Sequence, residues 1–213
     1  MPRRAIARLL IGFRQFREKF FSADDSVYGK LSTVGQAPKT LIIGCGDSRA
    51  DPAILFSSKP GELFVVRNIA NLVPPFEQGP GLHGVSSAIE YAVVNLKVEV
   101  VMVLGHRQCG GIRALLYPDE TGAGSFVRNW MKMAEPAKLR AIQSVGTGDP
   151  DTLCRRCELE SIRTSIENLR TFPFVAEAIR ERKLALLGVF FDLEKGEMLE
   201  LNEETGEFSP VVV

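Results

Sequence analysis

Two short motifs carrying soft metal-ligand chemistry follow two apolar segments of this 213-residue chain. Cys45 opens the motif Cys-Gly-Asp-Ser-Arg, and His106 and Cys109 bound the motif His-Arg-Gln-Cys. Thiolate and imidazole are groups that zinc binds, and three protein ligands with one exchangeable position are typical of a catalytic zinc site. The two motifs therefore predict one zinc ion per chain, held by Cys45, His106 and Cys109.

The segments before the two motifs indicate how such distant residues meet. Residues 40–44 and 98–105 are short, apolar and rich in β-branched side chains, which is typical of buried parallel strands. In an open parallel sheet, sites gather beyond the carboxyl ends of the strands. Ligands 64 positions apart in the sequence can therefore share one crevice.

Asp47 and Arg49 add charge beside the first cysteine. Asp47 either ligates the metal or stands one step back and accepts a hydrogen bond from a metal-bound hydroxide. Arg49 can form a bidentate pair with Asp47, which would keep the carboxylate ionised and turned away from the metal. An ordinary surface ion pair is the alternative interpretation.

Two further cysteine patterns could indicate chemistry other than zinc binding, but each is weaker evidence than the zinc motifs. Cys109 and Arg113 resemble the ends of a cysteine-phosphatase loop, but only three residues separate them, too few to wrap a phosphate. Cys154 and Cys157 form a C-x-x-C pattern, yet they lie in a charged, helical segment with no strand before it. We interpret these last two cysteines as structural.

Composition and charge narrow the class of protein. Hydrophobic residues make up 45% of the chain, enough for a substantial core, and the 26 basic and 26 acidic residues cancel. The chain therefore has no net positive charge that would attract nucleic acid or an anionic membrane. Arginines interrupt the apolar positions of the first 21 residues, so no secretory leader is evident. We expect reduced thiols and a cytoplasmic protein.

The order of elements predicts an α/β fold with a mostly parallel sheet of about four to five strands flanked by helices. We expect one domain over 1–213, with a helical arm at 1–34 and a zinc-binding core at 35–213. The first 21 residues form an amphipathic pattern, which favours docking on a core or on a partner subunit over a membrane surface. The predicted elements are a polar connector at 22–35, strands at 39–45, 62–66, 98–105, 184–191 and 198–201, a loop at 67–82, helices from 51, at 84–96 and from 110, and helices over 125–182 broken near 146–150 and at 173.

With these motifs in this order and spacing, the chain resembles the β-class carbonic anhydrases, in their plant-like, open-site branch. The resemblance implies a parallel central sheet, a swapped N-terminal helix, and a homodimer or dimer of dimers with zinc near each interface. Gly46 and the pair Arg107-Gln108 depart from the residues usual in this family. The segments that carry the resemblance are 36–39, 45–49, 60–71, 88–92, 105–111 and 173–175.

The implied activity is zinc-dependent, reversible hydration of carbon dioxide to bicarbonate and a proton by zinc-bound hydroxide. Asp47 would accept the hydrogen bond of the hydroxide, and Arg49 would hold Asp47. The resemblance places Gln36, Phe64 and Tyr91 around the carbon dioxide, and Ile69 adds to that apolar pocket. Two alternatives use the same ligands: a non-catalytic bicarbonate or zinc sensor, and an enzyme that hydrolyses carbon disulfide or carbonyl sulfide.

A second branch of this family closes its site by moving the aspartate onto zinc, helped by bicarbonate bound to a tryptophan, an arginine and a tyrosine. This sequence keeps the arginine as Arg67 but has Ile42 and Phe191 at the other two positions. An anion there would face apolar walls, which is costly. The sequence therefore predicts a site that stays open.

Overall fold

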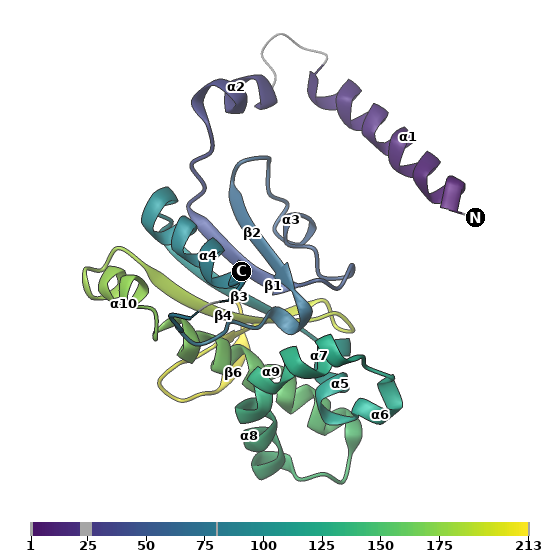
Figure 1. Cartoon of the computed structure of the whole chain (residues 1–213), viewed down its shortest axis with the longest axis vertical. Coiled ribbons are helices and arrows are strands. Elements are labelled where there is room, and N and C mark those ends of the chain that lie inside the picture. The colour runs from purple at the N-terminus through teal and green to yellow at the C-terminus, as the bar shows by residue number, and fades with distance from the viewer. Residues whose placement is uncertain (1, 22–26, 80, 213) are drawn as a thin grey trace.

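The computed structural model describes residues 2–21, 27–79 and 81–212 and contains one twisted sheet (Figure 1). Its strand order is β2-β1-β3-β4-β5-β6, with the first four strands parallel and the last two antiparallel. The predicted α/β class is confirmed, but the predicted strand count is one too low, because the short edge strand β6 was missed. The strands are β1 (Thr40–Cys45), β2 (Leu63–Asn68), β3 (Val100–His106), β4 (Ala185–Asp192), β5 (Glu197–Leu201) and β6 (Phe208–Pro210).

Helices cover the sheet and form a separate layer below it in Figure 1. The predicted helix starts near 51 and at 110 are confirmed, as are the breaks near 146–150 and at 173. Asp51 caps the first of these by accepting hydrogen bonds from two backbone amides. The described helices of the core are α3 (Pro52–Leu55), η1 (Ile69–Asn71), α4 (Gly84–Glu90), η2 (Tyr91–Leu96), α5 (Gly110–Leu116), α6 (Pro118–Thr121), α7 (Ser125–Met131), η3 (Lys132–Ala134), α8 (Glu135–Val145), α9 (Pro150–Leu169) and α10 (Pro173–Arg180).

The ends of β1 and β3 meet at one edge of the sheet. Gly44 pairs with Leu104, so the residues that follow each of them emerge side by side. The predicted loop at 67–82 begins too early, because β2 runs on to Asn68 and the turn η1 follows. This longer strand brings η1 to the same edge as Cys45, which pairs with Asn68.

Helix α9 lies unusually close to the sheet because glycines face it. A Cβ atom added at Gly105 would come within 2.6 Å of Ile162 Cδ1, and one at Gly188 within 2.9 Å of Ile162 Cγ2. Ile162 is fully buried in the largest apolar cluster, with Leu41 and Val103 of the central strands. This close packing holds the polar residues of α9 near the ends of β1 and β3.

The N-terminal arm consists of two helices rather than a helix and a connector. α1 (Pro2–Phe21) has the predicted helical form, but Val27–Val34 is the helix α2, and residues 22–26 of the predicted connector lie outside the described residues. Tyr28 of α2 stacks on Phe21 with ring centroids 5.2 Å apart. This aromatic contact stabilises a helix that local composition did not predict.

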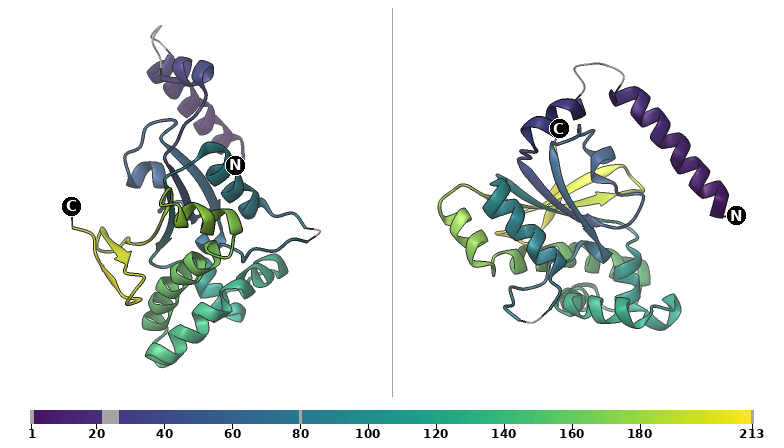
Figure 2. Two further views of the ribbon diagram at one scale, coloured as in Figure 1. Left: turned by 90° about the vertical axis from the view of Figure 1, so that its left-hand side faces the viewer. Right: turned by 45° about the horizontal axis from the view of Figure 1, so that its top comes forward.

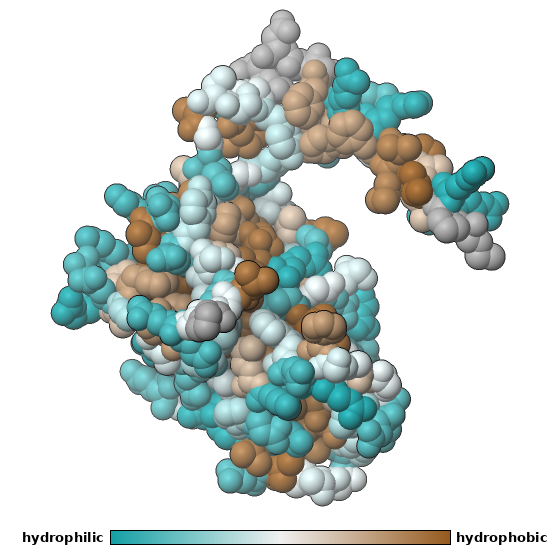
Figure 3. All heavy atoms as spheres, in the orientation of Figure 1, coloured by the Kyte–Doolittle hydropathy of each residue, from teal (hydrophilic) through white to brown (hydrophobic). Residues whose placement is uncertain are grey.

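α1 projects away from the body of the molecule in Figure 1 and in the right-hand view of Figure 2. Apolar side chains gather along it in Figure 3, and Leu9 is 75% exposed. Within the described part of the chain, no helix is both long and apolar enough to cross a membrane.

Candidate metal centre

Cys45, His106 and Cys109 converge at the shared edge of β1 and β3. Cys45 ends β1, His106 ends β3, and Cys109 precedes the first turn of α5. Their ligand atoms all lie within 4.8 Å of one another, and all three residues are buried. The tertiary structure thus brings together the three predicted zinc ligands.

The histidine is oriented as a metal ligand. His106 Nδ1 lies 2.8 Å from the backbone oxygen of Arg107, so Nδ1 carries the proton and donates it. The other ring nitrogen, Nε2, is buried and has no hydrogen-bond partner in the described protein. A buried nitrogen with a free lone pair, held by a hydrogen bond on the opposite side of the ring, fits zinc coordination.

The two cysteines shift each other's pKa in opposite directions in the metal-free protein. A hydrogen bond from Cys109, with a further contribution from His106, lowers the pKa of the Cys45 thiol despite its burial. The same contact with Cys45, reinforced by burial, raises the pKa of Cys109. One thiolate is therefore favoured before any metal binds, and the donor set of two sulfurs and one imidazole nitrogen suits zinc.

Asp47 stands beside these ligands, paired with Arg49. Arg49 Nε donates to Asp47 Oδ1 at 3.0 Å, and Arg49 Nη2 donates to Asp47 Oδ2 at 2.8 Å. This bidentate contact holds the pKa of Asp47 well below its usual range. Asp47 Oδ2 lies 3.9 Å from His106 Nε2, yet Asp47 is not one of the three clustered donors. This geometry matches the interpretation in which Asp47 stands one step back from the metal.

A cavity opens onto this centre. It has a volume of about 420 Å³, and its walls are mainly apolar, with Asp47 the charged residue among them. Ile69 is the one predicted pocket residue among its lining residues. The lining comprises Cys45, Gly46, Asp47, Ile69, Gly110, Gly111, Ala114, Thr121, Ala123 and Val127.

The other predicted pocket residues lie elsewhere in the single chain. Phe64 pairs with Leu41, four residues before Cys45, which places it about 13 Å along the sheet from the ligands. Tyr91 contacts Phe64, with ring centroids 5.8 Å apart, and is 46% exposed. Gln36 is exposed and precedes β1 at its opposite end. Within one chain, these three residues therefore do not line the cavity.

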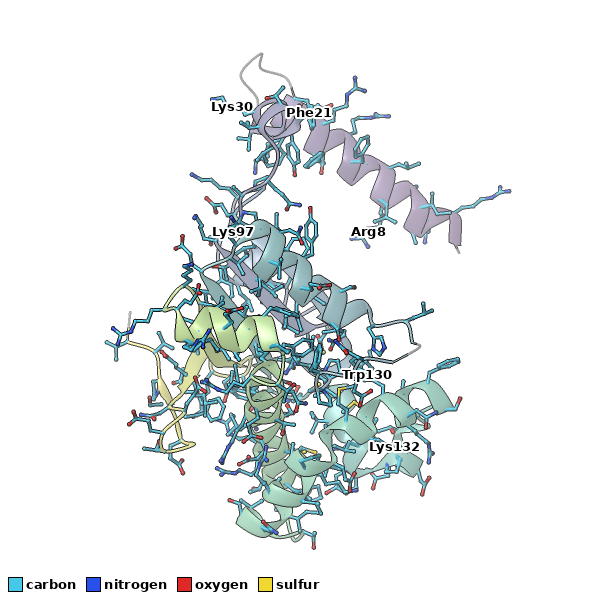
Figure 4. All side chains as sticks on the ribbon, turned by 60° about the vertical axis from the view of Figure 1, so that its left-hand side comes forward. Arg8, Phe21, Lys30, Lys97, Trp130 and Lys132 are labelled. Carbon is cyan, nitrogen blue, oxygen red and sulfur yellow. The ribbon has the colours of Figure 1, made fainter. Side chains whose placement is uncertain are left out.

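Two residues that the sequence analysis missed hold the walls of the site. Glu158 of α9 is only 3% exposed, and its Oε1 accepts a hydrogen bond from the amide of Cys109 at 2.9 Å. Burial raises the pKa of Glu158 to about 7, although the hydrogen bond from Cys109 opposes the shift. Trp130 of α7, labelled in Figure 4, donates from Nε1 to the backbone oxygen of Ile69 at 2.8 Å. Neither contact leaves a short-range signal in the sequence.

The three positions of the second anion pocket hold two apolar side chains and an arginine that is already hydrogen-bonded. Ile42 and Phe191 pack together in an apolar cluster. Arg67 already has three partners: it donates to the backbone oxygens of Cys45 and Asp47 at 2.9 and 2.6 Å, and to Asp51 Oδ2 at 2.6 Å. An anion at this position would therefore meet two apolar side chains and an arginine whose Nε, Nη1 and Nη2 each already donate a hydrogen bond.

Cys154 and Cys157 take no part in the ligand group. Both are buried on α9 and unpaired by any disulfide. Burial raises the pKa of Cys157 to about 12, so its thiol stays protonated. The interpretation of these two cysteines as structural agrees with their surroundings.

Comparison with known proteins gives consistent matches along most of the chain. The family model described as carbonic anhydrase matches residues 40–198. Beta carbonic anhydrase 3 of Arabidopsis thaliana is 35% identical over 206 residues, covering 94% of this chain and 79% of that protein. The solved structure of the beta-carbonic anhydrase CcaA has a TM-score of 0.90 at 31% identity and covers 98% of this chain and 93% of its own. A tetrameric beta-carbonic anhydrase of the ascomycete Sordaria macrospora has a TM-score of 0.79 at 28% identity, covering 99% and 98%.

Proposed function

This chain belongs to the β-class carbonic anhydrase family, and we propose that Asp47, Arg49 and the apolar cavity beside them carry out carbon dioxide hydration at its Cys45–His106–Cys109 zinc site. The reaction joins carbon dioxide and water to give bicarbonate and a proton, and it is reversible. When bound, zinc lowers the pKa of water and so supplies hydroxide near neutral pH. The remaining tasks fall to residues of the chain.

The observation that carries the proposal is the position of Asp47. Its Oδ2 lies 3.9 Å from His106 Nε2, while Arg49 engages both of its oxygens. A carboxylate kept ionised by arginine can only accept a hydrogen bond. Asp47 would therefore accept the hydrogen bond of the attacking hydroxide, without taking its proton, and so direct its lone pair toward the cavity.

The cavity suits an uncharged substrate. Apolar walls such as Ile69, Ala114 and Val127 bind carbon dioxide without desolvating a charge, whereas the bicarbonate product is an anion. Trp130 fixes the Ile69 wall through its hydrogen bond to the backbone. Uncharged substrate is thus favoured inside the cavity, and charged product is favoured in solvent.

We propose a homodimer or dimer of dimers in which each chain completes the site of another. Phe64 and Tyr91 lie far from the ligands of their own chain and are partly exposed, and α1 carries exposed apolar residues such as Leu9. A swapped α1 would bury that apolar side on a second copy, bringing Gln36, Phe64 and Tyr91 toward its cavity. Light scattering during gel filtration should give a dimer or a multiple of it; a stable, active monomer would contradict the proposal.

A stopped-flow carbon dioxide hydration assay on zinc-loaded protein tests the function. The parent protein should be active, and Asp47→Asn should retain one zinc per chain but lose most activity, because an amide no longer pairs with Arg49 as a pure acceptor. A parent protein that binds zinc without hydrating carbon dioxide would favour the sensor alternative. Full activity in Asp47→Asn would refute the orienting role.

We also propose that this chain works in the cytoplasm. Reducing conditions there keep the two thiol ligands available to the metal.

A further inference from the structure

We propose that Gln108 is a positioning residue, which holds Arg49, and through it Asp47, by bridging Arg49 to Glu194 in the turn between β4 and β5. The inference rests on the proposed function, because it assigns the residues that orient its catalytic pair. Gln108 lies in the segment that separates two zinc ligands, His106 and Cys109.

Gln108 meets Arg49 on the side that Asp47 leaves open. Arg49 Nη1 donates to Gln108 Oε1 at 3.3 Å, and Arg49 Nη2 donates to the backbone oxygen of Gln108 at 3.2 Å. Asp47 occupies Nε and the other hydrogen of Nη2. A planar guanidinium with acceptors on two adjacent sides has a defined orientation, which a contact on one side alone does not impose.

The other end of the Gln108 amide is attached to Glu194. Gln108 Nε2 donates to Glu194 Oε1 at 2.7 Å, while Glu194 Oε2 lies 2.9 Å from Arg107 Nε. Each group of the Gln108 side chain therefore has one partner, with its oxygen toward the catalytic pair and its nitrogen toward Glu194. These contacts also settle the orientation of the amide, since the reverse assignment would leave two donors facing each other.

The turn that carries Glu194 is itself anchored in the sheet. Asp192 ends β4, is 1% exposed and binds Arg155 at 2.7 Å. Its Oδ1 accepts a hydrogen bond from the amide of Glu194 at 3.1 Å. The restraint on Arg49 therefore leads back to a buried, charge-paired residue of a central strand rather than to a free surface side chain.

The backbone of Gln108 makes this bridge possible. Its φ is 58°, in the left-handed region that few residues other than glycine occupy. That conformation accompanies the turn that aims the Gln108 carbonyl at Arg49. Because this backbone contact survives side-chain substitution, loss of the amide should loosen the catalytic pair without breaking it.

Gln108→Met tests the proposal, because methionine matches the size of glutamine but lacks its hydrogen bonds. We expect kcat for carbon dioxide hydration to fall about threefold to tenfold, with KM, zinc content and melting temperature near those of the parent. Glu194→Ala should lower kcat similarly, and the double variant should be no slower than the slower single variant, because both changes break the same bridge.

Glu203→Ala is the matched control. Glu203 pairs with Arg170 at 2.6 Å in the other hairpin turn, away from the site, so the kcat of this variant should not change.

Three outcomes would overturn the proposal: parent-like kcat in Gln108→Met, multiplicative losses in the double variant, or loss of zinc in proportion to loss of activity. A crystal structure of zinc-loaded Gln108→Met provides a measurement that does not depend on activity. It should show Arg49 displaced or in several orientations, and an Arg49 unchanged from the parent would refute the positioning role. If the parent itself lacked hydration activity, the proposed function would fail, while this structural comparison would still decide whether Gln108 positions Arg49.

Discussion

Glu158→Gln replaces the buried acid behind the metal centre. We expect this variant to be more stable than the parent in the zinc-free state, by an amount that grows as the pH rises. Glu158 is 3% exposed, and one of its oxygens accepts the hydrogen bond of the Cys109 amide while the other has no partner in the described protein. Glutamine preserves an oxygen for the Cys109 amide and removes the buried charge. The variant thus separates the cost of the charge from the value of the hydrogen bond.

The magnitude follows from the pKa of Glu158. Burial raises the pKa from 4.5 to about 7, so the folded protein binds this proton more tightly than the unfolded chain does. The contribution of Glu158 to stability is therefore lost as the pH rises from about 4.5 to about 7, and above that range both states are ionised. Between pH 5 and pH 8 the advantage of Glu158→Gln over the parent should grow by about 2.5 kcal/mol, at 1.36 kcal/mol per pKa unit.

Urea unfolding of zinc-free protein at pH 5, 6, 7 and 8, at one fixed protein concentration, measures this difference. Glu160→Gln serves as the control, because Glu160 is equally buried but pairs with Arg140 at 2.8 Å and with Arg156 at 2.9 Å. That variant should be less stable than the parent, since it removes the buried charge that both arginines pair with and leaves Arg140 only Glu167 as an acidic partner. A difference between Glu158→Gln and the parent that stayed constant from pH 5 to pH 8 would refute the reasoning.

Two further predictions concern the metal and the regulation of the site. Cys109→Ala should lose its zinc in metal analysis while Cys154→Ala and Cys157→Ala each keep one ion per chain, because only Cys109 faces the other ligands; zinc retained in Cys109→Ala would contradict the assignment. Activity should decline smoothly toward low pH and show no cooperative inhibition by bicarbonate, because Arg67 is already paired with Asp51 and the other two positions of the anion pocket, Ile42 and Phe191, are apolar. A crystal structure at mildly acidic pH with Asp47 bound to zinc, or steep inhibition from a second anion site, would show that the site closes.

The sequence alone was sufficient for the zinc ligands and most of the core. Cys45, His106 and Cys109 could be identified because their chemistry is specific to a few metals and because each follows a β-branched segment or begins a glycine turn. Parallel strands buried on both faces leave continuous apolar runs, and helix caps such as Asp51 leave local signals. These are short-range properties, which sequence patterns record directly.

Elements held by distant contacts were predicted less well. Helix α2 looked like a polar connector, because the aromatic residues of α1 that stabilise it lie outside its own sequence. β6 is three residues long, ends in proline and exists only by pairing with β5. In both cases the tertiary partner, not local propensity, determined the structure.

Only the tertiary structure decided what surrounds the ligands. Glu158 lies 49 positions from Cys109, and Glu194 lies 86 positions from Gln108, and neither separation follows a helix or strand period. The tertiary structure also placed Phe64 and Tyr91 away from the zinc ligands of their own chain, although their residue types and order are those expected of a substrate pocket. Residue types identify which groups can bind zinc or carbon dioxide, whereas the packing of α9 and the turn after β4 against the strand ends determines which charges and hydrogen bonds reach them.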